Sequence, residues 1–223
     1  MKKVLFLLAV AVLFFQASGF SQKTRVGVTA GITNSNMYGT VGGTTFKGNP
    51  KAGVTVGMLL ESPIGKTKFS FQPAVSYVQK GYVISETNAA KSWAALRYVD
   101  LDFNFLLNSK GKTTFYIGLG PSVGFDLPSS FVTKTNNATA LNPDPNPEFS
   151  RAATKIKFGD ESLDNFRGLD FGINGMAGFR LAKGFSLSVN YNFGLRNIAT
   201  KGTPDELSNG YVGVRLGYLF KNK

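Results

Sequence analysis

Eight charged side chains of both signs recur in segments that otherwise alternate between apolar residues and small or polar ones. We assign all eight to the small and polar faces of these segments: Lys51, Lys80, Asp100, Asp102, Asp170, Arg180, Arg196 and Arg215. A charge that is removed from water needs a partner of opposite sign. The pattern therefore predicts a structural network of paired charges. A binding site or a conducting path is the functional alternative.

The composition excludes several kinds of catalysis. The chain contains neither histidine nor cysteine, so a histidine base, a Ser–His pair, a histidine metal ligand and a disulfide are all excluded. Ser–Lys and paired-Asp chemistry are formally open, but no spacing singles them out. Asp144 and Glu148 are two carboxylates in a proline-rich stretch, too few for a calcium site. We expect no catalytic, cofactor-binding or metal-binding residues, and a protein that is not an enzyme.

The elements that carry these charges read as β-strands, because their apolar residues recur with a period of two. The predicted strands cover residues 24–32, 51–60, 68–82, 93–107, 113–125, 168–181, 185–195 and 210–220. In the last strand Val212, Val214 and Leu216 share one face, and Gly213 and Arg215 share the other. An apolar outer face and a small or polar inner face are typical of outer-membrane strands.

The connections alternate in length. Short turns are predicted at 62–67, 108–112 and 182–184, and long loops at 33–50, 83–92, 126–167 and 196–209. Outer-membrane barrels have short periplasmic turns and long extracellular loops. The prediction is an all-β protein, an eight-stranded antiparallel up-and-down transmembrane β-barrel located in the bacterial outer membrane.

The small strand number limits what the barrel can contain. Eight strands leave an interior that side chains just fill, and this favours a structural charge network over a channel. Pro73 and Pro121 interrupt two predicted strands. Proline cannot donate a ladder hydrogen bond, so we expect a bulge or a strand end at each.

The N-terminus has the features of an export signal. Lys2 and Lys3 precede an apolar run over residues 4–15, and small residues follow at 17–19 and 21. The run is too short for a membrane-spanning helix, which needs about 20 residues. We predict a cleaved signal peptide over residues 1–21 and a barrel domain over residues 22–223.

The net charge of +12 is spread along the chain rather than clustered. Solvated loop charge accounts for it, and attraction to outer-membrane lipid or lipopolysaccharide is its functional interpretation. No nucleic-acid-binding motif is present, so no nucleic-acid partner is expected.

Five stretches resemble successive strands of the PorT-like outer-membrane β-barrel family. They are VSYVQKG at 75–81, LRYVDLDF at 96–103, FYIGLGP at 115–121, DFGINGMAG at 170–178 and YNFGLRNI at 191–198. The resemblance covers essentially the whole mature chain. One departure is the fourth strand, which tends to read YLEIP in such proteins and reads YVDLD at 98–102 here. The resemblance implies insertion by the barrel-assembly machinery, but it does not transfer a role in secretion.

We therefore expect a non-enzymatic integral outer-membrane barrel with a side-chain-filled lumen and long surface loops that serve envelope or interaction roles. The loop 126–167 is the predicted contact for an envelope protein partner, since loops of this length are commonly functional. The alternatives are a small-solute channel and a soluble lipocalin-like ligand-binding barrel. The latter would require an apolar interior.

Overall fold

The computed structural model describes residues 24–220 except 88, 137–148, 160, 162 and 201. The predicted signal peptide lies outside the described residues. The strands of the described part are β1 (Arg25–Val41), β2 (Thr44–Lys47), β3 (Asn49–Pro63), β4 (Phe69–Glu86), β5 (Ala90–Asn108), β6 (Thr114–Asn136), β7 (Phe149–Ile156), β8 (Leu169–Arg180), β9 (Phe185–Gly194) and β10 (Glu206–Leu219).

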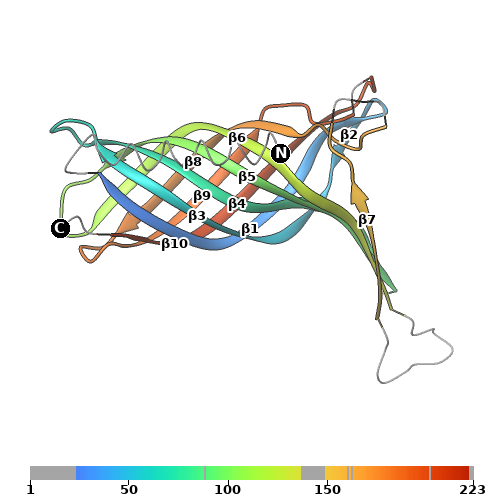
Figure 1. The fold of residues 1–223 in the computed structure, drawn as a ribbon, viewed down its shortest axis with the longest axis horizontal. Coiled ribbons are helices and arrows are strands. Elements are labelled where there is room, and N and C mark those ends of the chain that lie inside the picture. The colour runs from blue at the N-terminus through green and yellow to red at the C-terminus, as the bar shows by residue number, and fades with distance from the viewer. Residues whose placement is uncertain are drawn as a thin grey trace.

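Eight of these strands close into an antiparallel barrel (Figure 1). Each strand of the ring pairs with the next, in the order β1, β3, β4, β5, β6, β8, β9 and β10. The ring closes where β10 pairs with β1, from Gly27 opposite Leu219 to Thr40 opposite Glu206. Closure gives every strand of the ring a partner on both sides, which a lipid environment demands. The predicted fold class is confirmed, and each predicted strand overlaps one strand of the ring.

The two ends of the barrel differ as predicted. Residues 64–68, 109–113 and 181–184 form short connections at the end of the barrel where β10 also ends (Figure 1). The opposite end carries the longer joins, and there the strands extend beyond their predicted ends. β1 continues to Val41 rather than residue 32, and β6 continues to Asn136 rather than residue 125.

All four predicted long loops are thus partly strand, and two of them contain an additional strand. β2 pairs with the end of β1, and β7 pairs with the end of β6. The predictions of loops at 33–50, 83–92, 126–167 and 196–209 were wrong to the extent that strand residues lie within them. Beyond the apolar band both faces of a strand carry polar residues, so the period of two disappears from the sequence while the backbone pairing continues.

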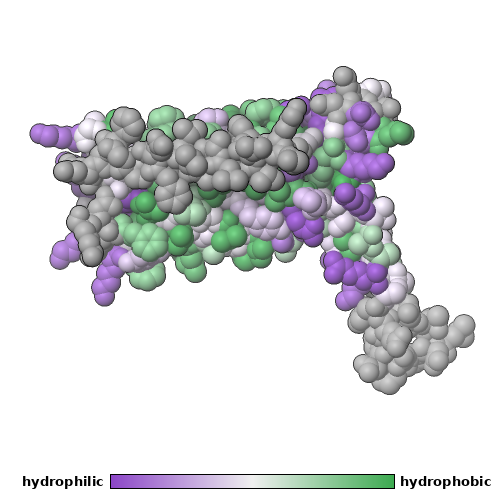
Figure 2. Space-filling view, in the orientation of Figure 1, coloured by the Kyte–Doolittle hydropathy of each residue, from purple (hydrophilic) through white to green (hydrophobic). Residues whose placement is uncertain are grey.

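The two barrel faces have opposite compositions. Ile32, Phe115 and Leu216 point outward and are 66%, 62% and 66% exposed. A broad hydrophobic band covers the visible barrel wall, and hydrophilic residues gather at its ends (Figure 2). The inward face is lined by buried polar residues, among them Thr33, Thr55, Ser76, Ser122 and Ser188. An apolar outside and a polar inside exclude a lipocalin-like arrangement, and they match a membrane barrel.

The two prolines are accommodated without the expected bulge or strand end. Pro73 pairs with Phe103 in β5, and Pro121 pairs with Ile173 in β8. On the opposite edge, toward β3 for Pro73 and toward β5 for Pro121, strand pairing is missing for a few residues and then resumes in the same register. A proline removes one donor, and the continuous pairing on its other side holds the strand in place.

Candidate functional site

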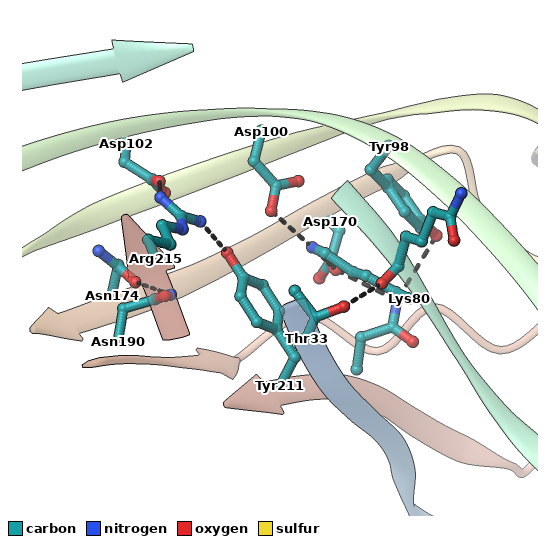
Figure 3. Close-up of polar contacts among 12 residues, drawn as sticks. Thr33, Lys80, Tyr98, Asp100, Asp102, Asp170, Asn174, Asn190, Tyr211 and Arg215 are labelled. Carbon is teal, nitrogen blue, oxygen red and sulfur yellow. Dashed lines mark hydrogen bonds and ion pairs between the residues drawn. The ribbon is translucent and has the colours of Figure 1, made fainter. Parts of the chain in front are cut away.

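A buried lysine lies at the centre of the lumen's largest polar cluster. Lys80 projects inward from β4 and is 1% exposed. Its Nζ lies 3.1 Å from Asp100 Oδ2 of β5 and 3.2 Å from Asp170 Oδ2 of β8 (Figure 3). It also lies 4.7 Å from the centroid of the Tyr98 ring and 5.4 Å from that of Tyr211. Two carboxylates and two aromatic faces thus surround one ammonium, which supplies the partners that a buried charge needs.

A second ion pair follows along the barrel axis. Arg215 Nη1 of β10 lies 3.9 Å from Asp102 Oδ2, and Arg215 Nη2 donates to the Tyr211 hydroxyl at 3.0 Å (Figure 3). Tyr211 therefore contacts both Arg215 and Lys80, and it joins the two ion pairs into one network. Because inward side chains alternate along a strand, Asp100 and Asp102 lie one above the other on β5.

Amides fill the level next to Arg215. Asn174 Nδ2 donates to Asn104 Oδ1 at 2.9 Å, and Asn190 Nδ2 donates to Asn174 Oδ1 at 3.2 Å. All three side chains are buried, and they come from β5, β8 and β9. This chain of hydrogen bonds crosses the lumen without any net charge.

A third charged cluster lies near the short-turn end and centres on Glu61 of β3. Arg180 of β8 makes a bidentate ion pair with this carboxylate, with Arg180 Nη1 2.8 Å from Glu61 Oε1. Arg25 Nη2 contacts the same Oε1 at 2.8 Å, and Gln72 Nε2 donates to Oε2 at 3.2 Å. Arg180 also lies 5.4 Å from the Tyr116 ring centroid.

The structure brings six of the eight predicted network residues into ion pairs. Asp100, Asp102, Asp170, Lys80 and Arg215 meet in one cluster, and Arg180 belongs to the cluster around Glu61. Sequence reasoning missed Glu61 because the predicted strand ended at residue 60. The signal was present, since continuing the alternation from the inward Leu59 places Glu61 inward.

The other two predicted residues lie elsewhere. The register of β3 shifts between Pro50 and Thr55, and the Lys51 ammonium donates to the Ala52 carbonyl at 3.2 Å in an exposed position. Arg196 follows the end of β9, and its guanidinium lies 5.4 Å from the ring of Phe171, an exposed side chain on the outer wall. Including these two residues in the lumen network was wrong. Lys51 lies opposite the buried Ser35 of β1, yet its ammonium bonds to the Ala52 carbonyl, and Arg196 lies beyond the end of β9.

Apolar side chains close the lumen above Lys80, at the long-loop end. They form one buried cluster: Met37, Ala94, Leu96, Tyr98, Ile156, Phe166 and Ile198. Phe46, Tyr82, Phe131, Phe158 and Leu207 pack against it. The members come from the inner faces of the barrel strands, from β2 and β7, and from two long connections. We call this cluster the apolar cap.

A pocket of about 210 Å³ opens at the short-turn end beside Arg25, Glu61 and Arg180. Deeper in the lumen lies an enclosed cavity of about 20 Å³, lined among others by Gln72, Asn104, Arg180 and Arg215. A space of this size holds about one water molecule. Within the described residues, no group of three or more acidic side chains could hold a metal ion. No helix in the same residues is long and apolar enough to cross a membrane.

Solved structures of outer-membrane proteins are similar to the chain. Ail, the attachment invasion locus protein of Yersinia pestis, is 11% identical over 88% of this chain and 98% of its own, with a TM-score of 0.41. Neisserial surface protein A is 11% identical over 87% and 97%, with a TM-score of 0.43. The outer membrane enzyme PagL is 15% identical over 84% and 98%, with a TM-score of 0.29. No curated protein matches the sequence.

A family model described as the outer membrane protein beta-barrel domain matches residues 16–200. This match spans most of the chain and includes strands β1 to β9. The closed ring and its apolar outer wall are the architecture that such a domain requires. The chain therefore belongs to the outer membrane protein beta-barrel domain family, and it is a β-barrel of the bacterial outer membrane.

Proposed function

We propose that the protein is a non-enzymatic, non-conducting barrel that anchors surface elements in the outer membrane. The observation that carries this proposal is the obstruction of the lumen at three levels. The apolar cap, the network of Lys80 and Arg215, and the cluster around Glu61 lie one after another along the barrel axis. Each level joins side chains from several strands, so together they stabilise the closed ring rather than form a path for a solute.

The small-solute channel remains the competing function, and conductance distinguishes the two. We expect the purified barrel to give no steady current in planar bilayers, because at least two ion-paired levels would have to rearrange for an ion to pass. A variant with a smaller cap, Phe166→Ala with Ile198→Ala, should also give no steady current, since the charged levels below stay in place. Steady, selective channels from the unaltered protein would refute the proposal.

The surface element with the greatest reach is the hairpin of β6 and β7, which projects from the long-loop end (Figure 1). It lies within residues 126–167, the predicted contact for an envelope protein partner. Among the described strands, β7 pairs only with β6, so its other edge offers backbone groups for pairing with a partner. We propose this hairpin as the contact for that partner.

A shortened hairpin tests the contact. Ser130 lies directly opposite Lys155, so residues 131–154 can be replaced by an Asn-Gly turn that fits a two-residue hairpin. The eight-stranded ring does not include β7, and we expect the variant to fold and to migrate on gels in a heat-dependent way. Pull-down from detergent-solubilised membranes should recover an envelope protein with the full-length chain but not with the shortened one. Equal recovery by both chains would contradict the proposal.

Two further features stay within this proposal. Residues 1–21 would be removed on export, and the mass of the protein isolated from outer membranes tests this directly. The order of the five PorT-like segments supports a PorT-like member of the family that the barrel-assembly machinery inserts. Depletion of that machinery should leave the chain unfolded and its gel migration independent of heating.

A further inference from the structure

The hairpin of β6 and β7 and the ends of β4 and β5 beside it form a four-stranded sheet beyond the barrel, which we call the arm. One row across this sheet consists almost entirely of cations. Lys91 of β5 lies directly opposite Lys134 of β6, which lies directly opposite Arg151 of β7. Like charges in directly opposed positions destabilise a sheet. Glu86 of β4 forms a salt bridge with Lys91, with Lys91 Nζ 2.8 Å from Glu86 Oε1. One carboxylate therefore lies at the end of a row of three cations.

Two more cations lie on the same face of the arm. Side chains alternate along a strand, so Lys155 shares a face with Arg151, and Arg97 shares a face with Lys91. The alternate residues Ala94 and Leu96 point into the apolar cap, which means that the cationic face is the outer one. We define the basic face by five residues: Lys91, Arg97, Lys134, Arg151 and Lys155.

The basic face also has an apolar centre. Trp93 of β5 lies opposite Val132 of β6, which lies opposite Ala153 of β7. This row adjoins the row of cations on the same face, and Val132 is buried there. An indole flanked by lysine and arginine side chains is the combination found at the level of lipid headgroups.

The direction in which the arm points indicates which ligand the basic face meets. The arm bends away from the barrel axis at the long-loop end (Figure 1), and hydrophilic residues gather along it (Figure 2). The face that continues the lipid-facing wall therefore turns toward the membrane surface. We propose that the basic face of the arm binds the phosphorylated headgroups of outer-leaflet lipids and so holds the arm against the membrane. The opposite face and the free edge of β7 stay open to the partner proposed above.

The absence of cysteine from the sequence permits a direct test with one introduced spin label. Ala153→Cys places the label on the basic face, and Thr154→Cys places it on the opposite face. Each labelled barrel is reconstituted in nanodiscs of phosphatidylcholine, alone or mixed with diphosphoryl lipid A. We expect lipid A to shield the label at residue 153 from a water-soluble relaxation agent and to leave the label at residue 154 accessible.

The second part of the experiment removes positive charges from the basic face. Each basic side chain near an anionic surface contributes about fivefold to binding. Replacing Lys134, Arg151 and Lys155 by glutamine should therefore raise the fraction of lipid A that gives half-maximal shielding by at least about tenfold. The matched control replaces three lysines near the short turns, Lys66, Lys68 and Lys110, and should leave that fraction unchanged.

Several results would overturn the proposal. Equal shielding in phosphatidylcholine alone would show that phosphate is not recognised, and equal behaviour of the two triple variants would show that the basic face is not the site. Shielding by soluble inorganic phosphate in phosphatidylcholine discs would show an anion site that is independent of the membrane. None of these results affects the conductance or pull-down experiments, so this inference and the proposed function can fail separately.

Discussion

At the scale of single residues, the Lys80 ammonium neutralises two buried carboxylates, and its removal is the most damaging change we expect in the lumen. In Lys80→Met, Asp100 and Asp170 keep their burial but lose the cation 3.1 and 3.2 Å away. Breaking a buried ion pair by removing one partner typically costs about 3–5 kcal/mol. The variant should show a lower urea midpoint in a refolding assay that follows heat-dependent gel migration.

Removing the carboxylates as well separates charge from packing. The variant Lys80→Met with Asp100→Asn and Asp170→Asn leaves no unpaired charge at this level, and it should recover most of the lost stability. Lys110→Met changes an exposed residue of a short turn, and should shift the free energy of unfolding by less than about 0.5 kcal/mol. If Lys80→Met is as stable as Lys110→Met, Lys80 does not hold the network together.

The residues of the network were only partly predictable. Strict alternation placed Asp100, Asp102 and Lys80 inward, and the structure agrees because β4 and β5 pair with each other in an unbroken register through these residues. Lys51 was included because it alternates with the inward residues of β3, and no hydropathy signal shows that its ammonium bonds to the Ala52 carbonyl instead of a lumen carboxylate. Pairing partners were not predictable at all, since they depend on which strands face one another across the lumen.

At the scale of strands, closure of the ring depends on a close approach between β1 and β10. A Cβ at Gly31 would lie 2.1 Å from the Val214 carbonyl oxygen and 2.9 Å from the Arg215 Cα, both of which are backbone atoms. Gly31→Ala should therefore push the two closing strands apart. Overpacking of this kind costs about 1–3 kcal/mol, and a lower urea midpoint would report it.

Gly175 of β8 provides the matched control. A Cβ there would have its nearest neighbour, Leu119 Cδ1, at 3.9 Å. Gly175→Ala should unfold at or slightly above the urea midpoint of the unaltered protein, since alanine also lowers the entropy of the unfolded chain. If the two alanine variants unfold at the same urea concentration, close packing at the seam does not limit stability.

The strands were predictable within the apolar band and not beyond it. In β6 the alternation of Phe115, Ile117 and Leu119 with glycine and tyrosine is set by the contrast between lipid and lumen. After residue 125 that contrast ends, because both faces of the arm meet water or the cap. The extension of β6 and its pairing with β7 follow from backbone hydrogen bonding between segments far apart in the sequence, which periodicity does not reveal.

At the scale of the whole molecule, the barrel reverses the usual distribution of a soluble protein. Its wall exposes Val28, Ile32, Ile117 and Leu216, while its centre buries lysine, aspartate and asparagine. In water such a wall would be a large exposed apolar surface. In a bilayer it is the stabilising face, and the closed ring leaves no strand edge exposed to lipid.

A charge placed on this wall should therefore cost more in a bilayer than it would on a soluble surface. Leu216 lies midway along the outward residues of β10 and is 66% exposed. An arginine at the bilayer midplane of an outer-membrane barrel costs about 2–4 kcal/mol, whereas an exposed surface substitution in water is usually within about 0.5 kcal/mol. Leu216→Arg should lower the urea midpoint for unfolding from phosphatidylcholine vesicles. Asn34→Arg, on an outward position of β1 nearer the long-loop end, should lower it less, because the cost of a charge falls toward the membrane interface. Equal stability of the two variants in vesicles would mean that lipid does not contact the wall at Leu216.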